Sequence, residues 1–200
     1  EEGDFRTVGG PLLDNDPENF PERCERAGLA LNEAGYSNGG ELGELEYLYE
    51  EDGVSGEIAR ALCAGWQERL GVTVTPRAVT RQELWAALRS GEYDLAGVAL
   101  DALGNDAECF LMAWTSDSQD NVASYENSAY DTLMSIIAHA ADGTARMGCL
   151  HDAEALLLED CALTPLYTQG TDWMLRETLT GACRDARGWF SFSGVIPRSA

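Results

Sequence analysis

Imidazole bases, the usual partners of a nucleophilic side chain, are few in this chain. His139 and His151 are its only histidines, and Cys149 lies two residues before His151. A thiol and an imidazole form a catalytic pair only when their side chains face each other. Residues two apart on a helix point about 200° apart, and the pattern around Cys149 predicts a helix. We therefore expect ordinary helix residues here, assign no catalytic residue and predict no enzyme.

Three acids that follow a short apolar run form a second candidate cluster. Asp101, Asp106 and Glu108 come soon after Tyr93–Leu100. Their carboxylates would suit the ammonium group of a ligand, or a cation. The alternative is that Asp106 caps a short helix and that the other two acids are solvated. Catalysis by paired carboxylates depends on their separation, which a sequence does not supply, so both interpretations stay open.

The cysteines and glycines give no sign of a metal or cofactor site. No two cysteines form C-x-x-C, and no histidine lies at zinc-finger spacing from a cysteine pair, so no metal is expected. The stretch Gly35–Gly40 lacks both phosphate-binding signatures, and we expect no cofactor. Cys63 and Cys161 fall among apolar helix positions, which predicts buried free thiols. For an exported protein one or two disulfides stay open, since six cysteines allow about 15 complete pairings.

The charge of the chain excludes several classes of partner. Its 200 residues include 35 acidic and 13 basic side chains, for a net charge of -22, and every basic residue is an arginine. Such an acidic protein repels phosphate backbones and anionic membrane surfaces, so no nucleic acid partner is expected. The acids are spread along the chain, which is typical of a solvated acidic surface. No apolar run approaches the roughly 20 residues of a membrane helix, no signal peptide is recognised, and the start, Glu1–Phe5, reads as an arbitrary cut.

The first half of the chain alternates between strand and helix patterns. Strands are predicted at Leu45–Tyr49, Val72–Thr75 and Tyr93–Leu100, and the last is apolar enough to be covered on both faces, as in a parallel sheet. Helices are predicted after a Ser55 cap and after the capping box Thr80–Glu83. This alternation predicts an α/β fold, with a mixed, mostly parallel sheet flanked by helices.

The rest of the chain is predicted to complete one lobe. Residues 1–21, which contain three prolines, are expected to form an irregular lead-in, and residues 22–200 a single α/β lobe. Further helices are predicted at Glu22–Ala34, at Ala107–Trp114, after an Asn127 cap and from Thr144, and further strands at Leu163–Thr168 and Trp173–Leu175. Pro165 places the first of these strands near a sheet edge or at a bulge.

Function is expected where the strand Tyr93–Leu100 ends. In open α/β sheets, ligands bind beyond the carboxyl ends of the strands. The chain turns from apolar to polar at this point, in the segment Asp101–Asp106. The loop after Leu100 is therefore the first candidate for a binding site.

An ordered series of motifs resembles one protein family. Glu57–Val72 resembles its helix followed by W-x-x-x-L-G-V, and Gly91–Leu95 resembles its G-x-[FY]-D strand. Asn121–Leu133 is similar to N-x-x-x-Y-x-N-x-x-[FY]-D-x-L, Glu154–Tyr167 to A-E-x-x-L-x-x-D-x-P-x-x-P-[LI]-Y, and Gly188–Phe192 to a closing G-x-x-D-F. The series runs in order over nearly all of residues 24–195. The chain thus resembles the extracytoplasmic solute-binding proteins of oligopeptide and dipeptide ABC importers.

The resemblance implies a periplasmic-binding-protein-like lobe that closes on a solute by hinge motion. This chain would be the C-terminal lobe, with the N-terminal lobe and a lipoprotein signal outside it. The protein would act outside the cytoplasm, at the cell surface or in the periplasm, with an ABC permease as its partner. The solute would be an oligopeptide or another small polar molecule. The alternative is an interaction or sensory domain of the same descent that no longer binds a transport ligand.

The resemblance also places the binding residues around the loop after Leu100. Asp101, Asn105 and Asp106 would hold a polar or cationic group of the solute, together with backbone groups at the strand ends. Leu100 and Leu103 are also expected to contact the solute, and Trp114 and Tyr125 would form apolar walls. No catalytic role and no metal is implied.

This chain departs from the family pattern at the expected site. The family often has a tryptophan at the position of Leu100 and an acid, able to hold the amino terminus of a peptide, at the position of Leu103. A proline is usual at the position of Ala107. These departures weaken the expectation of a peptide solute and favour the alternative of an interaction or sensory domain.

Overall fold

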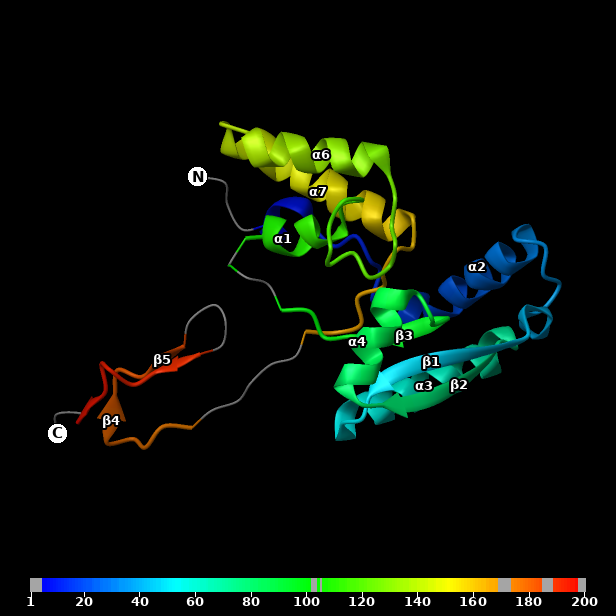
Figure 1. Ribbon diagram of the computed structural model, residues 1–200, viewed down its shortest axis with the longest axis horizontal. Coiled ribbons are helices and arrows are strands. Elements are labelled where there is room, and N and C mark those ends of the chain that lie inside the picture. The colour runs from blue at the N-terminus through cyan, green and yellow to red at the C-terminus, as the bar shows by residue number, and fades with distance from the viewer. Residues whose placement is uncertain (1–4, 102–103, 105, 169–173, 185–188, 198–200) are drawn as a thin grey trace. The chain divides into compact units, whose positions relative to one another are not determined.

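The computed structural model describes residues 5–101, 104, 106–168, 174–184 and 189–197. The chain divides into two compact units, whose elements are labelled in Figure 1. The sheet unit comprises Gly10–Ala99 and Val122–Ser124, and the helical unit comprises Glu1–Gly9, Leu100–Asn121 and Tyr125–Ala200. The loop that follows Leu100 therefore belongs to the helical unit.

Three parallel strands form the sheet of the sheet unit, in the order β2-β1-β3. They are β1 Glu44–Glu50, β2 Thr73–Val79 and β3 Leu95–Gly97. Tyr47 of β1 is paired with Pro76 of β2 and with Leu95 of β3. The central strand of the described sheet is β1. The predicted strand Tyr93–Leu100 is therefore corrected to three half-buried residues at the edge of this sheet.

Strand β2 continues past the proline that was expected to follow it. The sequence predicts an end at Thr75, but the strand runs through Pro76 to Val79. A proline lacks an N–H to donate, and it is tolerated in a strand that has a neighbour on one side only. Within the described sheet β2 is such an edge strand, since it pairs with β1 alone.

The helices of the sheet unit begin and end at recognisable caps. They are α2 Phe20–Glu33, α3 Gly53–Leu70 and α4 Arg81–Ser90, with short 3-10 turns at Pro17–Asn19 and Gly39–Leu42. The predicted Thr80–Glu83 capping box of α4 is confirmed. The predicted Ser55 cap of α3 is wrong, because Asp52 is the cap and its carboxylate accepts the N–H of Ser55.

Helices cover both faces of the sheet. Tyr47 and Leu48 are adjacent on β1 and therefore point to opposite faces. Tyr47 packs with Ala59 and Cys63 of α3 in one buried cluster. Leu48 packs in a second cluster with buried leucines of α4, Leu84 and Leu88. The prediction of an α/β fold with a parallel sheet flanked by helices is confirmed.

The helical unit is built on two long helices and several short ones. Its helices are α1 Phe5–Gly9, α5 Glu108–Leu111, α6 Ser128–His139 and α7 Gly143–Glu159, and the 3-10 turn η3 Met112–Trp114 extends α5. The predicted Asn127 cap of α6 is confirmed, and its amide oxygen accepts the N–H groups of Ala129 and Tyr130. Helix α1 falls within the segment 1–21 that is predicted to be irregular.

The core of the helical unit lies between α5, α6 and α7. Its buried side chains are Leu111, Trp114, Tyr130, Met134, Ile137, Met147, Leu150, Ala153 and Leu157. Tyr130 is completely buried, and its hydroxyl donates to the carbonyl oxygen of Leu111 at 2.7 Å. This bond joins the short helix α5 to the long helix α6. Helix α5 follows the segment after Leu100, so the bond also holds the end of that segment near α6.

Beyond α7 the described chain forms two short antiparallel strand pairs. β4 Leu179–Thr180 pairs with β7 Ile196–Pro197, and β5 Cys183–Arg184 pairs with β6 Phe190–Ser191. The predicted strand Leu163–Thr168 is wrong, since this stretch has no strand pairing in the structure. Of the predicted strand Trp173–Leu175, Trp173 lies outside the described residues and the other two residues form no strand.

Every cysteine is a free thiol in the structure. Cys63 is buried, as predicted, and burial raises the pKa of its thiol. Cys161 is exposed, so the prediction of a buried thiol is wrong there. Among the residues that the structure describes, no helix combines the length and the apolarity needed to cross a membrane.

Candidate functional site

The loop after β3 is open at its first residues. The side chain of Leu100 is 45% exposed, and Asp101 is also exposed. No hydrogen bond or ion pair engages Asp101 within the part of the chain that the structure describes. Leu103 and Asn105, two further predicted binding residues, lie outside the described residues. Leu100 and Asp101 therefore present an apolar and an anionic side chain to solvent, side by side in the sequence.

Asp106, at the far end of this loop, is tied to α7. One guanidinium nitrogen of Arg146 lies 2.9 Å from Asp106 Oδ1 and 2.7 Å from Glu108 Oε2. The hydrogen bond from Arg146 holds the pKa of Asp106 below its ordinary value. The same Asp106 oxygen accepts the N–H of Glu108 at the start of α5. Asp106 thus contacts the first turn of α5, but the N-cap position is Ala107 and Glu108 is ion-paired, so the alternative that the sequence leaves open holds only in part.

Tyr125 is held by a polar contact with the end of α7. Its hydroxyl donates to Asp160 Oδ2 at 2.7 Å, and Asn127 donates to the same oxygen at 2.7 Å. Burial, followed by the hydrogen bond to Asp160, raises the pKa of Tyr125 to about 12. The ring of Tyr125 meets the ring of Tyr130 edge-on, with centroids 5.4 Å apart. Tyr125 is therefore a fixed, half-buried side chain.

Trp114 lies in the core of the helical unit rather than on its surface. Only 5% of the residue is exposed. Its ring therefore offers little area to a solute in this conformation, and its role as an apolar wall stays a prediction. Asn121, the first residue of the motif Asn121–Leu133, orders the neighbouring turn: it donates to the carbonyl oxygens of Thr115 and Tyr125 and accepts the Tyr125 N–H. The polar cluster around Asn121 is the signal for such a turn.

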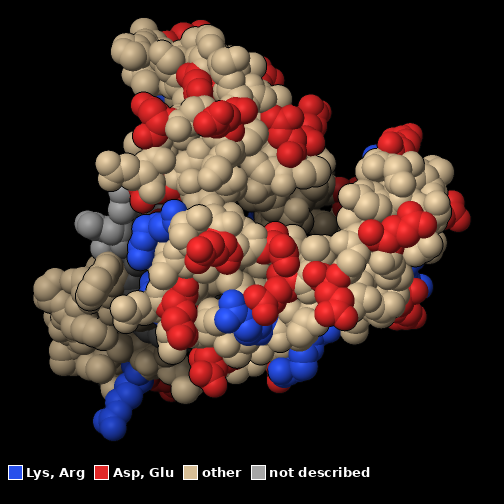
Figure 2. All heavy atoms as spheres, turned by 45° about the vertical axis from the view of Figure 1, so that its right-hand side comes forward, with Lys and Arg blue, Asp and Glu red and all other residues tan. Residues whose placement is uncertain are grey.

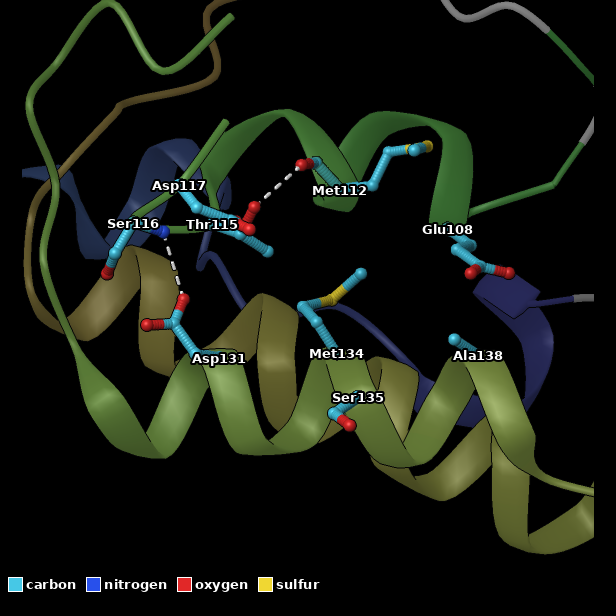
Figure 3. A pocket seen from close by; sticks show the side chains of 9 residues that line it. All are labelled: Glu108, Met112, Thr115, Ser116, Asp117, Asp131, Met134, Ser135 and Ala138. Atoms are coloured by element: carbon cyan, nitrogen blue, oxygen red, sulfur yellow. Dashed lines mark hydrogen bonds between the residues drawn. The ribbon is translucent and has the colours of Figure 1, made fainter. Parts of the chain in front are cut away.

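The helical unit also contains a pocket that the sequence does not reveal. An open cavity of ≈ 460 Å³ lies between the α5–η3 segment and α6 (Figure 3). Met112 and Met134 border its middle, with Glu108 toward one end and Asp131 toward the other. Its full lining is Glu108, Met112, Thr115, Ser116, Asp117, Asp131, Met134, Ser135 and Ala138. The pocket depends on how two helices pack, for which single-sequence patterns carry no signal.

The two histidines lie on different helices and contact different groups. His139 of α6 is exposed, and its Nδ1 lies 2.8 Å from the carbonyl oxygen of Ser135. His151 of α7 stacks on Phe5 of α1, with ring centroids 4.1 Å apart. Within the described ranges, no group of three His, Cys, Asp or Glu side chains is placed to hold a metal ion.

Acidic side chains are spread over the surface. Figure 2 shows carboxylates scattered across the visible face, with few arginines among them. This distribution agrees with the solvated acidic surface that the even spacing of the acids predicts.

Comparison with curated proteins places the chain among periplasmic binding proteins. No family model matches it. The probable deoxycholate-binding periplasmic protein YgiS of Escherichia coli (strain K12) is 31% identical over 160 residues, which are 80% of this chain and 30% of that protein. The periplasmic oligopeptide-binding protein OppA of Salmonella typhimurium is 30% identical over 146 residues, or 73% of this chain and 27% of that protein. The chain therefore spans less than a third of the length of these relatives.

Solved structures of such proteins share the fold. The substrate-binding domain of an oligopeptide ABC transporter from Bacillus anthracis matches with a TM-score of 0.77 at 20% identity, over 98% of this chain and 38% of that one. Haemophilus influenzae OppA, in complex with the peptide RPPGFSPFR, matches with a TM-score of 0.66 at 26% identity, over 76% of this chain and 30% of that one. Sequence and fold agree with the ordered motifs, and the chain belongs to the family of extracytoplasmic solute-binding proteins of oligopeptide ABC importers.

Proposed function

We propose that this chain is a ligand-binding lobe of a solute-binding protein, the C-terminal one of two, which closes on its solute by hinge motion and delivers it to an ABC permease. The observation that carries the proposal is the exposed pair Leu100 and Asp101, at the start of the loop after β3. Ligands of open α/β sheets bind beyond such strand ends. The function is binding rather than catalysis.

The solute is an oligopeptide or another small polar molecule with a cationic group. Asp101 is the acid of the loop best suited to an ammonium group, because Asp106 and Glu108 already share the cation of Arg146. Leu100 supplies an apolar contact beside it. Leu103, Asn105, Asp106, Trp114 and Tyr125 remain proposed members of the same site. The relatives named as oligopeptide-binding proteins support a peptide, whereas the relative named as deoxycholate-binding points to a second class of solute.

The protein acts outside the cytoplasm, in the periplasm or as a lipoprotein at the cell surface. Several relatives are named as periplasmic. Their greater length leaves room for the second lobe that a closing clamp requires. An interaction or sensory domain of the same descent is the second candidate, favoured by Leu100, Leu103 and Ala107 at positions where the family often has other residues.

A thermal-shift screen tests the proposal. The chain, and any longer product that its gene encodes, is incubated with peptide pools and separately with bile acids such as deoxycholate. A bound solute at 100 times its Kd stabilises a protein by about 2.7 kcal/mol, which raises Tm measurably. We expect a peptide to raise the Tm of the wild-type protein, and to raise that of Asp101→Asn by less. In the control Asp152→Asn, which removes a charge on α7, the rise in Tm should equal that of wild type. A shift with bile acids alone would contradict the peptide, and no shift with either class would favour the interaction domain.

A further inference from the structure

We propose that the pocket between the α5–η3 segment and α6 binds a small aliphatic amine, through an ammonium group at its acidic rim and a hydrocarbon chain against its methionines. The proposal does not depend on the solute of the loop after β3. It concerns a cavity of ≈ 460 Å³ whose walls come entirely from the helical unit.

The middle of the pocket is apolar and adaptable. Met112 of η3 is 52% exposed, whereas Met134 of α6 is 6% exposed, so one thioether stands at the surface and the other lies below it. Figure 3 shows the Met134 side chain pointing from α6 toward the α5–η3 segment, the Met112 side chain lying along that segment, and Ala138 farther along α6. Methionine side chains are flexible and polarisable, and they adapt to apolar chains of different shape. These walls suit hydrocarbon rather than a polar solute.

The rim of the pocket is negative. Three of its nine lining residues are acids, Glu108, Asp117 and Asp131, and none is basic. Carboxylates around a concave, low-dielectric surface concentrate cations and repel anions. The rim therefore selects an amphiphile with a positive end.

The three acids are not equally available to a ligand. Glu108 is paired with Arg146 at 2.7 Å, and one oxygen of Asp131 accepts the N–H of Ser116 at 2.9 Å. Asp117 is exposed, and within the described part of the chain it has no hydrogen bond or ion pair. Asp117 and the second oxygen of Asp131 are therefore the acceptors for an ammonium group.

The chain contains no lysine, so it has no aliphatic ammonium side chain of its own to fill the pocket. A primary amine is a compact cation with three donors, which matches two carboxylates on one rim better than the planar fork of a guanidinium does. A single hydrocarbon tail on this amine then lies along Met112 and Met134.

Titration with three probes of equal chain length tests the proposal. Hexylamine, hexanol and hexanoate are each added to the 200-residue chain while the methyl signals of its methionines are followed by NMR. We expect hexylamine to shift the signals of Met112 and Met134 with a Kd on the order of 1 mM, hexanol to bind more weakly, and hexanoate not to bind. Equal binding of hexanoate, or no shift with hexylamine, would overturn the proposal.

Variants that each remove one carboxylate then show which acids bind the ammonium group of hexylamine. Asp117→Asn and Asp131→Asn are each expected to weaken hexylamine about threefold to tenfold, and the second keeps an oxygen for the Ser116 N–H. Asp152→Asn on α7 removes one negative charge as well but lies outside the pocket lining, so the affinity of this variant for hexylamine should match that of wild type. Equal weakening by all three variants would mean nonspecific attraction to an acidic protein, and would overturn the site. Met112→Ala should weaken hexylamine while leaving the salt dependence of binding unchanged.

Discussion

Arg146 of α7 lies 2.9 Å from Asp106, and this ion pair joins a long helix to the end of the loop that follows β3. The same guanidinium nitrogen reaches Glu108 at 2.7 Å. The side chain of Arg146 is only 14% exposed, so solvent screens these pairs less than it screens ion pairs at the open surface. Arg146 is therefore expected to fix the position of the loop as well as to stabilise the helical unit.

Replacing Arg146 by alanine should lower the free energy of unfolding of the helical unit by about 2 kcal/mol, because two hydrogen-bonded carboxylates lose their cation. Urea denaturation measures this change. Arg77→Ala is the matched control, because the Arg77–Glu46 pair at 2.9 Å is also short but its side chains are 53% and 41% exposed. That control should cost less than about 1 kcal/mol. Equal losses in the two variants would contradict the special role of Arg146.

Asp106 should make the helical unit less stable in acid. Its pKa is lowered in the folded state, chiefly by the hydrogen bond from Arg146. A carboxyl group of this kind contributes stability that is fully present above its unfolded pKa of about 4, and that is lost as the pH falls through the lower, folded pKa. Denaturation series from neutral pH to below pH 4 measure the loss. The fall should be smaller in Asp106→Asn than in wild type, and parallel curves for the two proteins would count against the assignment.

Tyr130→Phe should destabilise the helical unit by about 1–2 kcal/mol. The substitution removes the hydroxyl that donates to Leu111 and leaves a carbonyl oxygen buried without that donor. Tyr125→Phe is the comparison, because its hydroxyl bonds to the exposed Asp160, which water can solvate instead. The predicted order of stability is wild type, Tyr125→Phe, then Tyr130→Phe. The reverse order by thermal denaturation would contradict this account of the core.

Two glycines of the sheet unit should respond to alanine in opposite directions. At Gly39 a methyl group would meet the backbone of Leu70 and Val72 closer than atoms can approach, so Gly39→Ala should cost about 1–3 kcal/mol. Gly65 lies inside α3 with open space around its Cα, so Gly65→Ala should stabilise by about 0.5–1 kcal/mol through helix propensity. Both changes are measured by chemical denaturation. Stabilisation by both alanines would mean that Gly39 is not tightly packed.

The sequence predicts elements whose signals are local. The capping box of Thr80 and Glu83 and the Asn127 cap depend on residues within a few positions, and the structure confirms them. The strand at Leu45–Tyr49 is also confirmed, as part of β1, but its burial does not alternate, because Tyr47 and Leu48 are both buried. Ser55 misled the prediction because Asp52, three residues earlier, supplies a competing side-chain acceptor. The prediction that the strand ends before Pro76 is wrong because an edge strand tolerates proline. A single sequence does not show how many neighbours a strand has.

Features that depend on packing could not be predicted. The place of β1 at the centre of the described sheet follows from pairing between segments far apart in the sequence. Asp106 pairs with Arg146, which lies 40 residues away, so the sequence alone does not show that this carboxylate already has a partner. The pocket beside Met112 and Met134 exists only because η3 and α6 pack together. Among the described residues of the predicted loop, Leu100, Asp101 and Asp106 are exposed, and they remain proposed binding residues.

Hydrogen exchange measured by mass spectrometry tests most directly whether the loop after β3 holds the solute. The chain, or the longer product of its gene, is compared with and without the peptide that raises its Tm most. The account predicts slower exchange in the fragments that contain Leu100 and Asp101, and loss of this protection in Asp101→Asn. Protection confined to other segments, with unchanged exchange around Leu100 and Asp101, would contradict it.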